Sequence, residues 1–215
     1  MIGKTKSVII ALCAGAFVMG TAGCTASAGP AEPSSSPPTA SISTPSTSST
    51  PTAKPTPKPV PASSKGPAQN WPVPKMPEAA KKKSEEGIVA FTKYYFELVD
   101  YTVLTYDTKP IKSVTEHSCY LCAKQLIDPG DRNRGKGSWH VGGKTTLKVN
   151  FAKEVDSGGV SGFTFLRDKT LIYLPSGELQ GKIPALTNPA AGTLQMIFAD
   201  GWKVADVEFI DPDGK

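Results

Sequence analysis

Proline is very unevenly distributed along this chain of 215 residues, and its distribution limits where a folded core can form. Fourteen of the 20 prolines lie between Pro30 and Pro77, and the other six follow that stretch. In residues 25–70, Ser, Thr, Pro and Ala account for 36 of 46 positions, and only two side chains are sizeable and apolar. Such a segment buries too little apolar surface to offset the entropy lost on ordering. We therefore expect a disordered tether at residues 24–70 and a single folded domain at residues 71–215.

The start of the chain has the composition of a secretory signal. Lys4 and Lys6 precede an apolar run of about a dozen residues, and small residues follow that run. A helix that remains in the membrane needs roughly 20 apolar residues, so a permanent N-terminal anchor is the less favoured alternative. The sequence therefore predicts an exported protein.

The small residues before Cys24 resemble a bacterial lipobox, although Thr21 stands where such signals usually have Leu. This resemblance implies that residues 1–23 are removed as a signal peptide. It also implies that Cys24 receives a diacylglyceryl group, with acyl chains such as palmitate. Two or more acyl chains suffice for stable anchoring. The expected product is a lipoprotein held at the cell membrane through Cys24, on its extracytoplasmic side.

The later part of the tether has proline at nearly every second position from Pro51 to Pro61, a pattern typical of stiff polyproline II. We interpret the tether as a spacer that lifts the domain away from the membrane within the cell envelope. A proline-rich ligand for a partner domain and a glycosylated stalk are the alternatives, because composition alone names no partner.

The net charge of +5 belongs mostly to the signal and the tether. Residues 71–215 hold 19 basic and 18 acidic side chains, so the expected domain is close to neutral. Domains that bind nucleic acid usually concentrate positive charge on one face. We therefore expect no nucleic-acid partner.

The first part of the domain has apolar residues at spacings of three and four, which predicts a long helix from Pro77 to about Thr105. A second helical region is expected at residues 111–114 and 119–127. The Asp-Pro-Gly-Asp sequence at residues 128–131 has strong turn chemistry and is expected to end it.

Residues after this point alternate between apolar and polar, which predicts strands. The expected alternations are Leu147, Val149 and Phe151; Val160, Phe163 and Phe165, continued by 171–174 after a possible interruption at Arg167-Asp168; Leu194, Met196 and Phe198; and Trp202, Val204, Val207 and Phe209. Residues 181–192 are expected to be a loop, and Asp200-Gly201 a two-residue hairpin turn. The apolar phase slips near Ala205-Asp206, which indicates a bulge. The polar residues 211–215 should fray.

These elements predict an α+β domain, with a long N-terminal helix and a second helical region packed on a curved antiparallel sheet of about four strands. The element order and the closing hairpin at residues 200–204 resemble the nuclear transport factor 2-like cone fold. The lipobox, the tether, Met76-Pro77 and the pattern Phe91, Tyr94-Tyr95, Cys119-Tyr120-Leu121-Cys122 resemble actinobacterial lipoproteins of unknown function. That cone fold carries isomerases, hydrolases and non-catalytic binding modules, so the resemblance implies no particular chemistry.

Cys119 and Cys122 are the only two cysteines left once the signal is removed and Cys24 is acylated, and three interpretations compete for them. Outside the cytoplasm two lone cysteines usually form a disulfide, which would here close a very short loop. A redox pair assisted by His117 is the second interpretation. A metal site that adds His117 and His140 is the third, although its spacing is unlike that of usual zinc sites. The expected location outside the cytoplasm favours the structural disulfide.

The remaining candidates are weaker. His140 would be a general base if a cone pocket opened onto it, and Asp107 is the second candidate for such an enzyme. The mixed charges of residues 128–136 indicate an exposed turn and not an anion site. We therefore expect no catalytic set, no metal site and no cofactor. The favoured function is a non-catalytic module that binds a protein, a cell-wall component or a small apolar ligand. The alternatives are a thiol–disulfide oxidoreductase and a small-molecule enzyme of the cone pocket.

Overall fold

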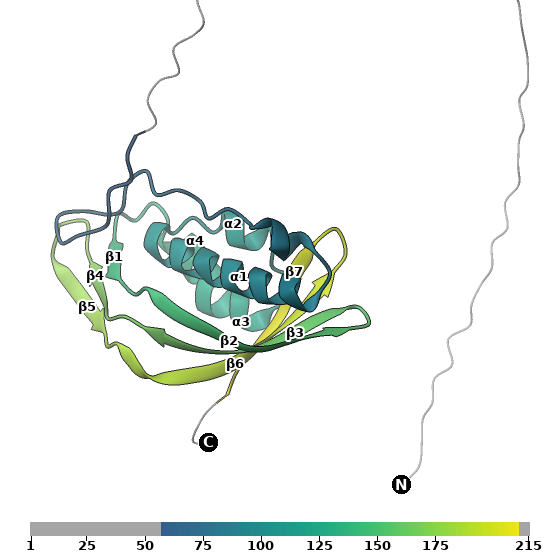
Figure 1. Cartoon of the computed structure of the whole chain (residues 1–215). Helices are drawn as coiled ribbons and strands as arrows, with labels where there is room; N and C mark the ends of the chain where they lie inside the picture. Colours follow the sequence, from purple (N-terminus) through teal and green to yellow (C-terminus); the bar gives the residue numbers. More distant parts are fainter. Residues whose placement is uncertain (1–56, 211–215) are drawn as a thin grey trace, which may run out of the picture. The chain divides into compact units, whose positions relative to one another are not determined.

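The computed structural model describes residues 57–210, in which helices pack against two antiparallel sheets (Figure 1). The predicted α+β class is confirmed. The signal at residues 1–23, Cys24, the tether up to residue 56 and the tail at residues 211–215 lie outside the described residues. Within the part of the chain that is described, no helix is long and apolar enough to cross a membrane.

The longest helix, α1 (Glu85–Thr105), begins later than the predicted start at Pro77. Pro77 instead precedes a separate 3₁₀ turn, η1 (Glu78–Lys81). The hydroxyl of Ser84 accepts a hydrogen bond from the Gly87 amide at 3.1 Å. Because the first amides of a helix have no partner within it, a side chain that binds one of them sets the start of the helix.

Four short helical segments follow α1, and they extend further than predicted. They are α2 (Lys109–Lys112), α3 (Tyr120–Cys122), the π-helical turn η2 (Ala123–Ile127) and α4 (Asp128–Asn133). The prediction that residues 128–131 end the helix is wrong, because they form α4. Pro129 lies in the first turn of α4, where its missing N–H leaves no hydrogen bond broken.

The described residues form seven strands, where about four were expected. The larger sheet has the order β2-β3-β6-β7 and the smaller sheet the order β1-β4-β5. The strands are β1 (Trp139–Gly142), β2 (Thr145–Val155), β3 (Gly158–Arg167), β4 (Thr170–Tyr173), β5 (Leu179–Ile183), β6 (Leu186–Phe198) and β7 (Trp202–Ile210).

The prediction of a loop at residues 181–192 is wrong, because these residues belong largely to β5 and β6. Proline is uncommon inside a sheet. Pro189, however, falls where the register between β6 and β3 shifts, so its missing N–H interrupts no regular ladder. The predicted interruption at residues 167–168 is confirmed, because β3 ends at Arg167 and β4 begins at Thr170.

The bulge predicted in the last strand is confirmed. Ala205 of β7 has no partner in β6, and Val204 and Val207 on either side of the irregularity are both buried. An extra residue in one strand restores the inward phase of the side chains that follow it. The turn before β7 differs from the prediction, because three residues, 199–201, join the paired ends of β6 and β7.

A second irregularity, in β2, reverses one prediction. Leu147 and Val149 are partly buried, as the alternation indicates. The register then shifts between Val149 and Phe151, and the Phe151 side chain is 52% exposed. Its ring covers Gly162 of β3, where an added Cβ would lie 2.0 Å from a ring carbon. The prediction that Phe151 continues the inward face is therefore wrong.

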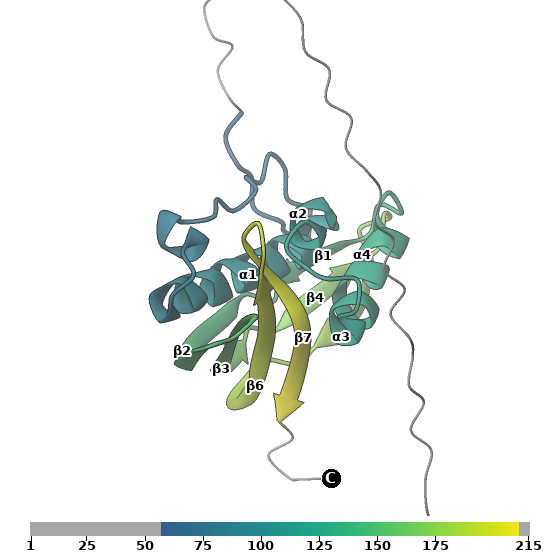
Figure 2. The same cartoon turned by 90° about the vertical axis from the view of Figure 1, so that its right-hand side faces the viewer.

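Helix α1 lies along the concave face of the larger sheet, and α3 lies beside β7 (Figures 1 and 2). The core forms between them from fully or nearly fully buried side chains, among them Ile88, Phe91, Tyr95, Leu98, Phe163, Leu194, Met196, Trp202 and Val204. Thr92 of α1 adds a polar link, because its hydroxyl lies 2.8 Å from the hydroxyl of Ser161 on β3. These contacts fix the position of α1 over the sheet.

Residues 57–70 differ from the predicted tether, because they form an ordered hairpin against the domain. The amides and carbonyls of Val60 and Gln69 are bonded reciprocally at 2.9 Å. The indole N–H of Trp139 on β1 donates to the Ser63 carbonyl at 2.7 Å. Trp139 is itself buried and stacks on Tyr173 at a ring distance of 5.4 Å. The ordered part of the chain therefore includes residues that composition assigned to the tether.

Candidate functional site

A cavity of about 500 Å³ lies between α1, the α3–η2 segment and strands of both sheets. Its wall is mainly apolar and includes Tyr95, Phe96 and Val99 from α1, Leu121 and Leu126 from α3 and η2, and Phe165, Leu194, Val207 and Phe209 from the larger sheet. The 3.6-residue period of α1 explains why Tyr95, Phe96, Val99 and Val103 share this face. A volume of this size is typical of sites for small molecules.

Two polar side chains in the wall, Asp100 and Thr145, link α1 to the start of β2. Asp100, on α1, accepts hydrogen bonds from the Thr145 hydroxyl at 2.7 Å and from the Thr145 amide at 3.1 Å. Burial raises the pKa of the Asp100 carboxyl, and the two bonds from Thr145 oppose that rise. Both carboxylate oxygens therefore have partners within the protein.

His140, on β1, also lines the cavity and is held by Tyr106. The Nε2 atom of His140 lies 3.1 Å from the Tyr106 hydroxyl, and the two rings meet edge to face at 5.2 Å. Burial lowers the pKa of His140, with a smaller opposing contribution from the backbone of Val103. Nδ1 of His140 is buried without a hydrogen-bond partner, since the Val103 carbonyl lies near the ring but outside hydrogen-bond geometry. The imidazole is therefore favoured in its neutral form.

Two glycines allow the chain to cross between the sheets beside this site. Gly142 and Gly143 have φ angles of 82° and 79°, a region that side chains with a Cβ rarely adopt. A Cβ on Gly143 would lie 2.5 Å from the Thr170 hydroxyl oxygen, and one on Gly142 would lie 2.3 Å from the Lys169 carbonyl oxygen. The junction thus requires glycine for both conformation and space.

The rim of the cavity is formed by the lining residues whose side chains are exposed. They are Gln125 of η2, Arg167 at the end of β3, Ile183 of β5 and Phe209 of β7. Arg167 takes part in none of the ion pairs of the described residues. The rim therefore combines apolar surface with one free guanidinium group.

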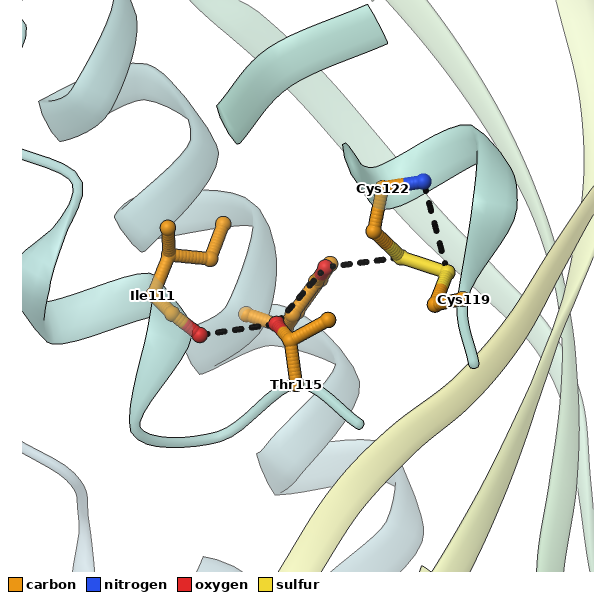
Figure 3. Close-up of a disulfide and its surroundings, with 5 residues drawn as sticks. Ile111, Thr115, Cys119 and Cys122 are labelled. Atoms are coloured by element: carbon orange, nitrogen blue, oxygen red, sulfur yellow. Dashed lines mark hydrogen bonds between the residues drawn. A yellow bond between two sulfur atoms is a disulfide. The ribbon is translucent and has the colours of Figure 1, made fainter. Parts of the chain in front are cut away.

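Cys119 and Cys122 are joined by a disulfide (Figure 3). Cys122 also lines the cavity. Both residues are less than 5% exposed. The hydroxyl of Tyr95 donates to the Cys122 sulfur at 3.3 Å and lies 3.3 Å from the Thr115 hydroxyl. Burial raises the pKa of Tyr95 to about 12, with the Thr115 bond acting in the opposite direction. The disulfide and Tyr95 thus position α3 against α1.

The other predicted candidates lie away from the cavity. His117 is exposed at the surface. Asp107 is not among the lining residues, and it pairs with Arg134 at 3.2 Å and accepts a hydrogen bond from Tyr101. No group of three or more His, Cys, Asp or Glu side chains within residues 57–210 is arranged to hold a metal ion. The structure therefore does not bring His117, His140 and the cysteines together as one ligand set.

Sequence reasoning missed Asp100, Thr145 and Arg167. Asp100 does carry a signal in the sequence, because it is the only charged residue between Leu98 and Tyr106, in the last turns of the predicted helix. Arg167 carries no such signal, since it looks like any charged residue at the end of a strand.

A second depression, of about 360 Å³, lies on the outer side of α1 beside Val89 and is open to solvent.

Comparisons with known proteins place the chain in a family without giving it an activity. No curated protein matches the chain. It is similar to a solved structure, the intermembrane space region of the chloroplast protein ARC6, at 8% identity and a TM-score of 0.42, over 60% of this chain and 98% of that one. A likeness at this level supports no conclusion about fold or function. A family model matches residues 57–173, from the N-terminal hairpin to the end of β4. Since this match covers more than half of its length, the chain belongs to a family of unknown function, DUF6318.

Proposed function

We propose that this protein is a non-catalytic binding protein of the cell envelope, and that its domain holds a small, mostly apolar ligand. The observation that carries this proposal is the cavity of about 500 Å³, whose wall is formed mainly by aliphatic and aromatic side chains. Burial of apolar ligand surface in such a cavity is favourable by roughly 25 cal/mol for each Å² removed from water. A preformed cavity also spares the cost of ordering a flexible site.

The arrangement of polar groups supports a binding role over a catalytic one. General acid–base catalysis needs a proton-transfer group within reach of a substrate. When such a base activates a nucleophile, a third group usually orients the base. His140 is held by Tyr106, and no carboxylate among the described residues is hydrogen-bonded to it. Asp100 is occupied by Thr145, and Asp107 lies outside the cavity. The cavity does open onto His140, as the cone-pocket enzyme requires, but Asp107, the second candidate for that enzyme, is not part of its wall.

As part of the same proposal, the domain is cone-like and similar to nuclear transport factor 2-like proteins. Support comes from the curved sheet, which passes beneath α1, and from the cavity between the sheet and the helices (Figure 1). In such a shape the closed end is filled by the core and the open end admits a ligand. Here Phe91 and Trp202 belong to the core, whereas Phe209 lies at the rim.

We further propose that the protein is an actinobacterial-type lipoprotein, anchored at the cell membrane through Cys24 after removal of residues 1–23. The lipobox-like sequence supports this, and so does a disulfide in the domain, since disulfides persist mainly outside the cytoplasm. Mass analysis of the membrane fraction should find acylated Cys24, and Cys24→Ser should release the protein from the membrane. Unmodified Cys24 in the mature membrane-bound protein would reject the anchor.

Ligand binding in the cavity is tested with the fluorescent apolar probe N-phenyl-1-naphthylamine. Val99→Phe and Val103→Phe each add a ring to the cavity wall, so both are expected to lower probe binding at least tenfold. Val89→Phe is the matched control, because it adds the same ring to α1 beside the outer depression. Thermal unfolding of each variant shows whether its fold is retained. Equal binding by Val89→Phe and the folded cavity variants would contradict the proposal.

The oxidoreductase alternative is disfavoured by the burial of both sulfurs. Thiol–disulfide exchange requires a thiolate to approach one sulfur directly, and Cys119 and Cys122 are less than 5% exposed. We expect the native protein to resist reduction by glutathione and to become reducible in denaturant. Rapid reduction of the native protein, followed by thiol labelling of Cys119 or Cys122, would restore this alternative.

A further inference from the structure

We infer that the ligand of the cavity is a single-chain amphiphile with an anionic head group, whose chain lies inside and whose head group binds Arg167 at the rim. This inference rests on the proposed binding function and adds the ligand's chemical class and its orientation. It follows from the positions of the two charged side chains in the wall, Asp100 and Arg167.

The interior of the cavity disfavours an anionic group. Asp100 is the only charged side chain of the inner wall, and its carboxylate would repel a second negative charge in a region of low dielectric. Its oxygens are already bonded to Thr145, so Asp100 offers no unsatisfied atom to a cationic head group either. A charged group held inside would lose its hydration without gaining a charged partner. The interior therefore favours an uncharged chain.

The rim provides the partner that the interior lacks. Arg167 pairs with Thr145 across β3 and β2, so their side chains leave the sheet on the same face. The Thr145 side chain points toward α1, where it bonds Asp100, so the Arg167 side chain starts on the cavity side. The guanidinium group is exposed and forms no ion pair among the described residues. A guanidinium group matches the paired oxygens of a carboxylate or a phosphate.

Two exposed apolar residues of the rim favour a chain that passes through it. Ile183 is 37% exposed and Phe209 is 52% exposed, and both line the cavity. A chain that enters between them removes their surface from water. At about 30 Å³ for each water-sized group, a cavity of about 500 Å³ holds on the order of 15 methylene groups. This capacity fits one acyl chain and is too small for a lipid with two long chains.

The experiment compares four amphiphiles with the same chain by calorimetry on the purified protein: dodecanoate, dodecyl phosphate, dodecanol and dodecylamine. We expect dodecanoate to bind roughly fivefold more tightly than dodecanol, the gain typical of one exposed ion pair. Dodecyl phosphate should behave like dodecanoate, and dodecylamine should bind most weakly.

Arg167→Gln should remove the preference for dodecanoate over dodecanol and leave the affinity for dodecanol unchanged. Arg132→Gln is the matched control, because Arg132 is an exposed arginine of α4 outside the cavity wall. It should retain the preference. The readout is the ratio of two affinities on one variant, so a small change in stability does not alter it.

The outcomes separate this inference from the proposed function. Binding of dodecanol and dodecanoate with equal affinity, or tighter binding of dodecylamine, overturns the inference and leaves the binding function standing. Failure of all the amphiphiles and of the naphthylamine probe overturns both. Incubation with vesicles that contain both phosphatidylglycerol and its single-chain lyso form distinguishes the sources of an anionic lipid: we expect the single-chain lysolipid to be retained. Retention of the intact two-chain lipid overturns the limit of one chain.

Discussion

The polar residues of the cavity wall show how single side chains are kept in an apolar environment. Asp100 and His140 are each tied to one hydroxyl-bearing residue, Thr145 and Tyr106. Tyr106 reaches His140 from a left-handed backbone conformation with φ of 56°, at the end of α1. A non-glycine residue in this region is strained, and the surrounding contacts must offset the strain. The contact with His140 is one such compensation.

We expect acidification from about pH 7 to about pH 5 to lower the free energy of unfolding through His140. Burial lowers the pKa of His140 in the folded protein, whereas in the unfolded chain it titrates near pH 6.5. The unfolded chain therefore takes up the proton first as the pH falls. The stability that this group contributes is fully present above about pH 6.5 and is lost as the pH falls toward the folded pKa.

Urea denaturation across this pH range checks the expectation. His140→Gln should show a smaller loss of stability on acidification than the parent protein. His117→Gln, which changes an exposed histidine of the same domain, should retain the parent's dependence. An unchanged pH dependence in His140→Gln would contradict the assignment.

Gly143→Ala should destabilise the protein by about 2–3 kcal/mol, because a left-handed conformation costs a residue with a Cβ about 1–3 kcal/mol and because the new methyl group would collide with Thr170. Gly177→Ala is the control that separates the two causes. Gly177 has a similar φ of 85°, but nothing lies within 4 Å of an added Cβ. Chemical denaturation should therefore show a smaller loss for Gly177→Ala, and equal losses would exclude the collision.

At the scale of elements, the α3–η2 segment is short and depends on its attachments. The Cys119 sulfur caps its start by accepting a hydrogen bond from the Cys122 amide at 3.3 Å. The disulfide closes the same turn. Tyr95 then joins this turn to α1. Because Leu121 and Leu126 of this segment form one wall of the cavity, its attachment also shapes the site.

Replacement of both cysteines by serine should lower the free energy of unfolding by about 2 kcal/mol, the loss that chain entropy predicts for a four-residue loop.

Tyr95→Phe should lower the free energy of unfolding by about 1 kcal/mol, because it removes the hydrogen bonds of the hydroxyl and keeps the disulfide. Urea denaturation of the three proteins measures both contributions. A double variant as stable as the parent would show that the packing of α3 alone fixes the turn.

At the scale of the molecule, the hairpin of residues 57–70 contacts the smaller sheet, one strand of which also lines the cavity. The hairpin is held by Trp139, and the next residue of β1, His140, lines the cavity. The family match also begins at residue 57, where the described structure begins. The folded part of the chain that the structure describes therefore includes residues 57–70.

A chain that begins at residue 71 should be less stable than one that begins at residue 57, by about 1–2 kcal/mol. The shorter chain loses the bond from Trp139 to Ser63, worth about 1 kcal/mol, and exposes part of the Trp139 ring. Thermal denaturation and the emission wavelength of Trp139 measure the change, with Trp139→Phe in the longer chain as the reference. Equal stability of the two chains would show that residues 57–70 do not stabilise the domain, as expected of a tether.

The comparison of sequence and structure shows where local signals were sufficient. The change of apolar phase near Ala205 correctly predicts the bulge. Without an extra residue at that point, every later side chain of the strand would face the wrong side of the sheet. The turn signal at Pro129 is misleading, and Pro189 lies within a predicted loop that is a strand, because each proline is at a position where its missing N–H breaks no regular hydrogen bond. The start of α1 was placed too early because apolar periodicity extends into η1, whereas the cap at Ser84 decides the boundary.

The sequence by itself determined the α+β class, the near-neutral charge of the domain and the proximity of two cysteines within one turn. These properties depend on residues that are neighbours along the chain or recur with a fixed period. The cavity, its rim and the attachment of residues 57–70 were decided only by the tertiary structure. Asp100 and Thr145, or Ser63 and Trp139, are 45 and 76 residues apart. Their contacts exist because the sheet folds around α1, and no local pattern encodes such an approach.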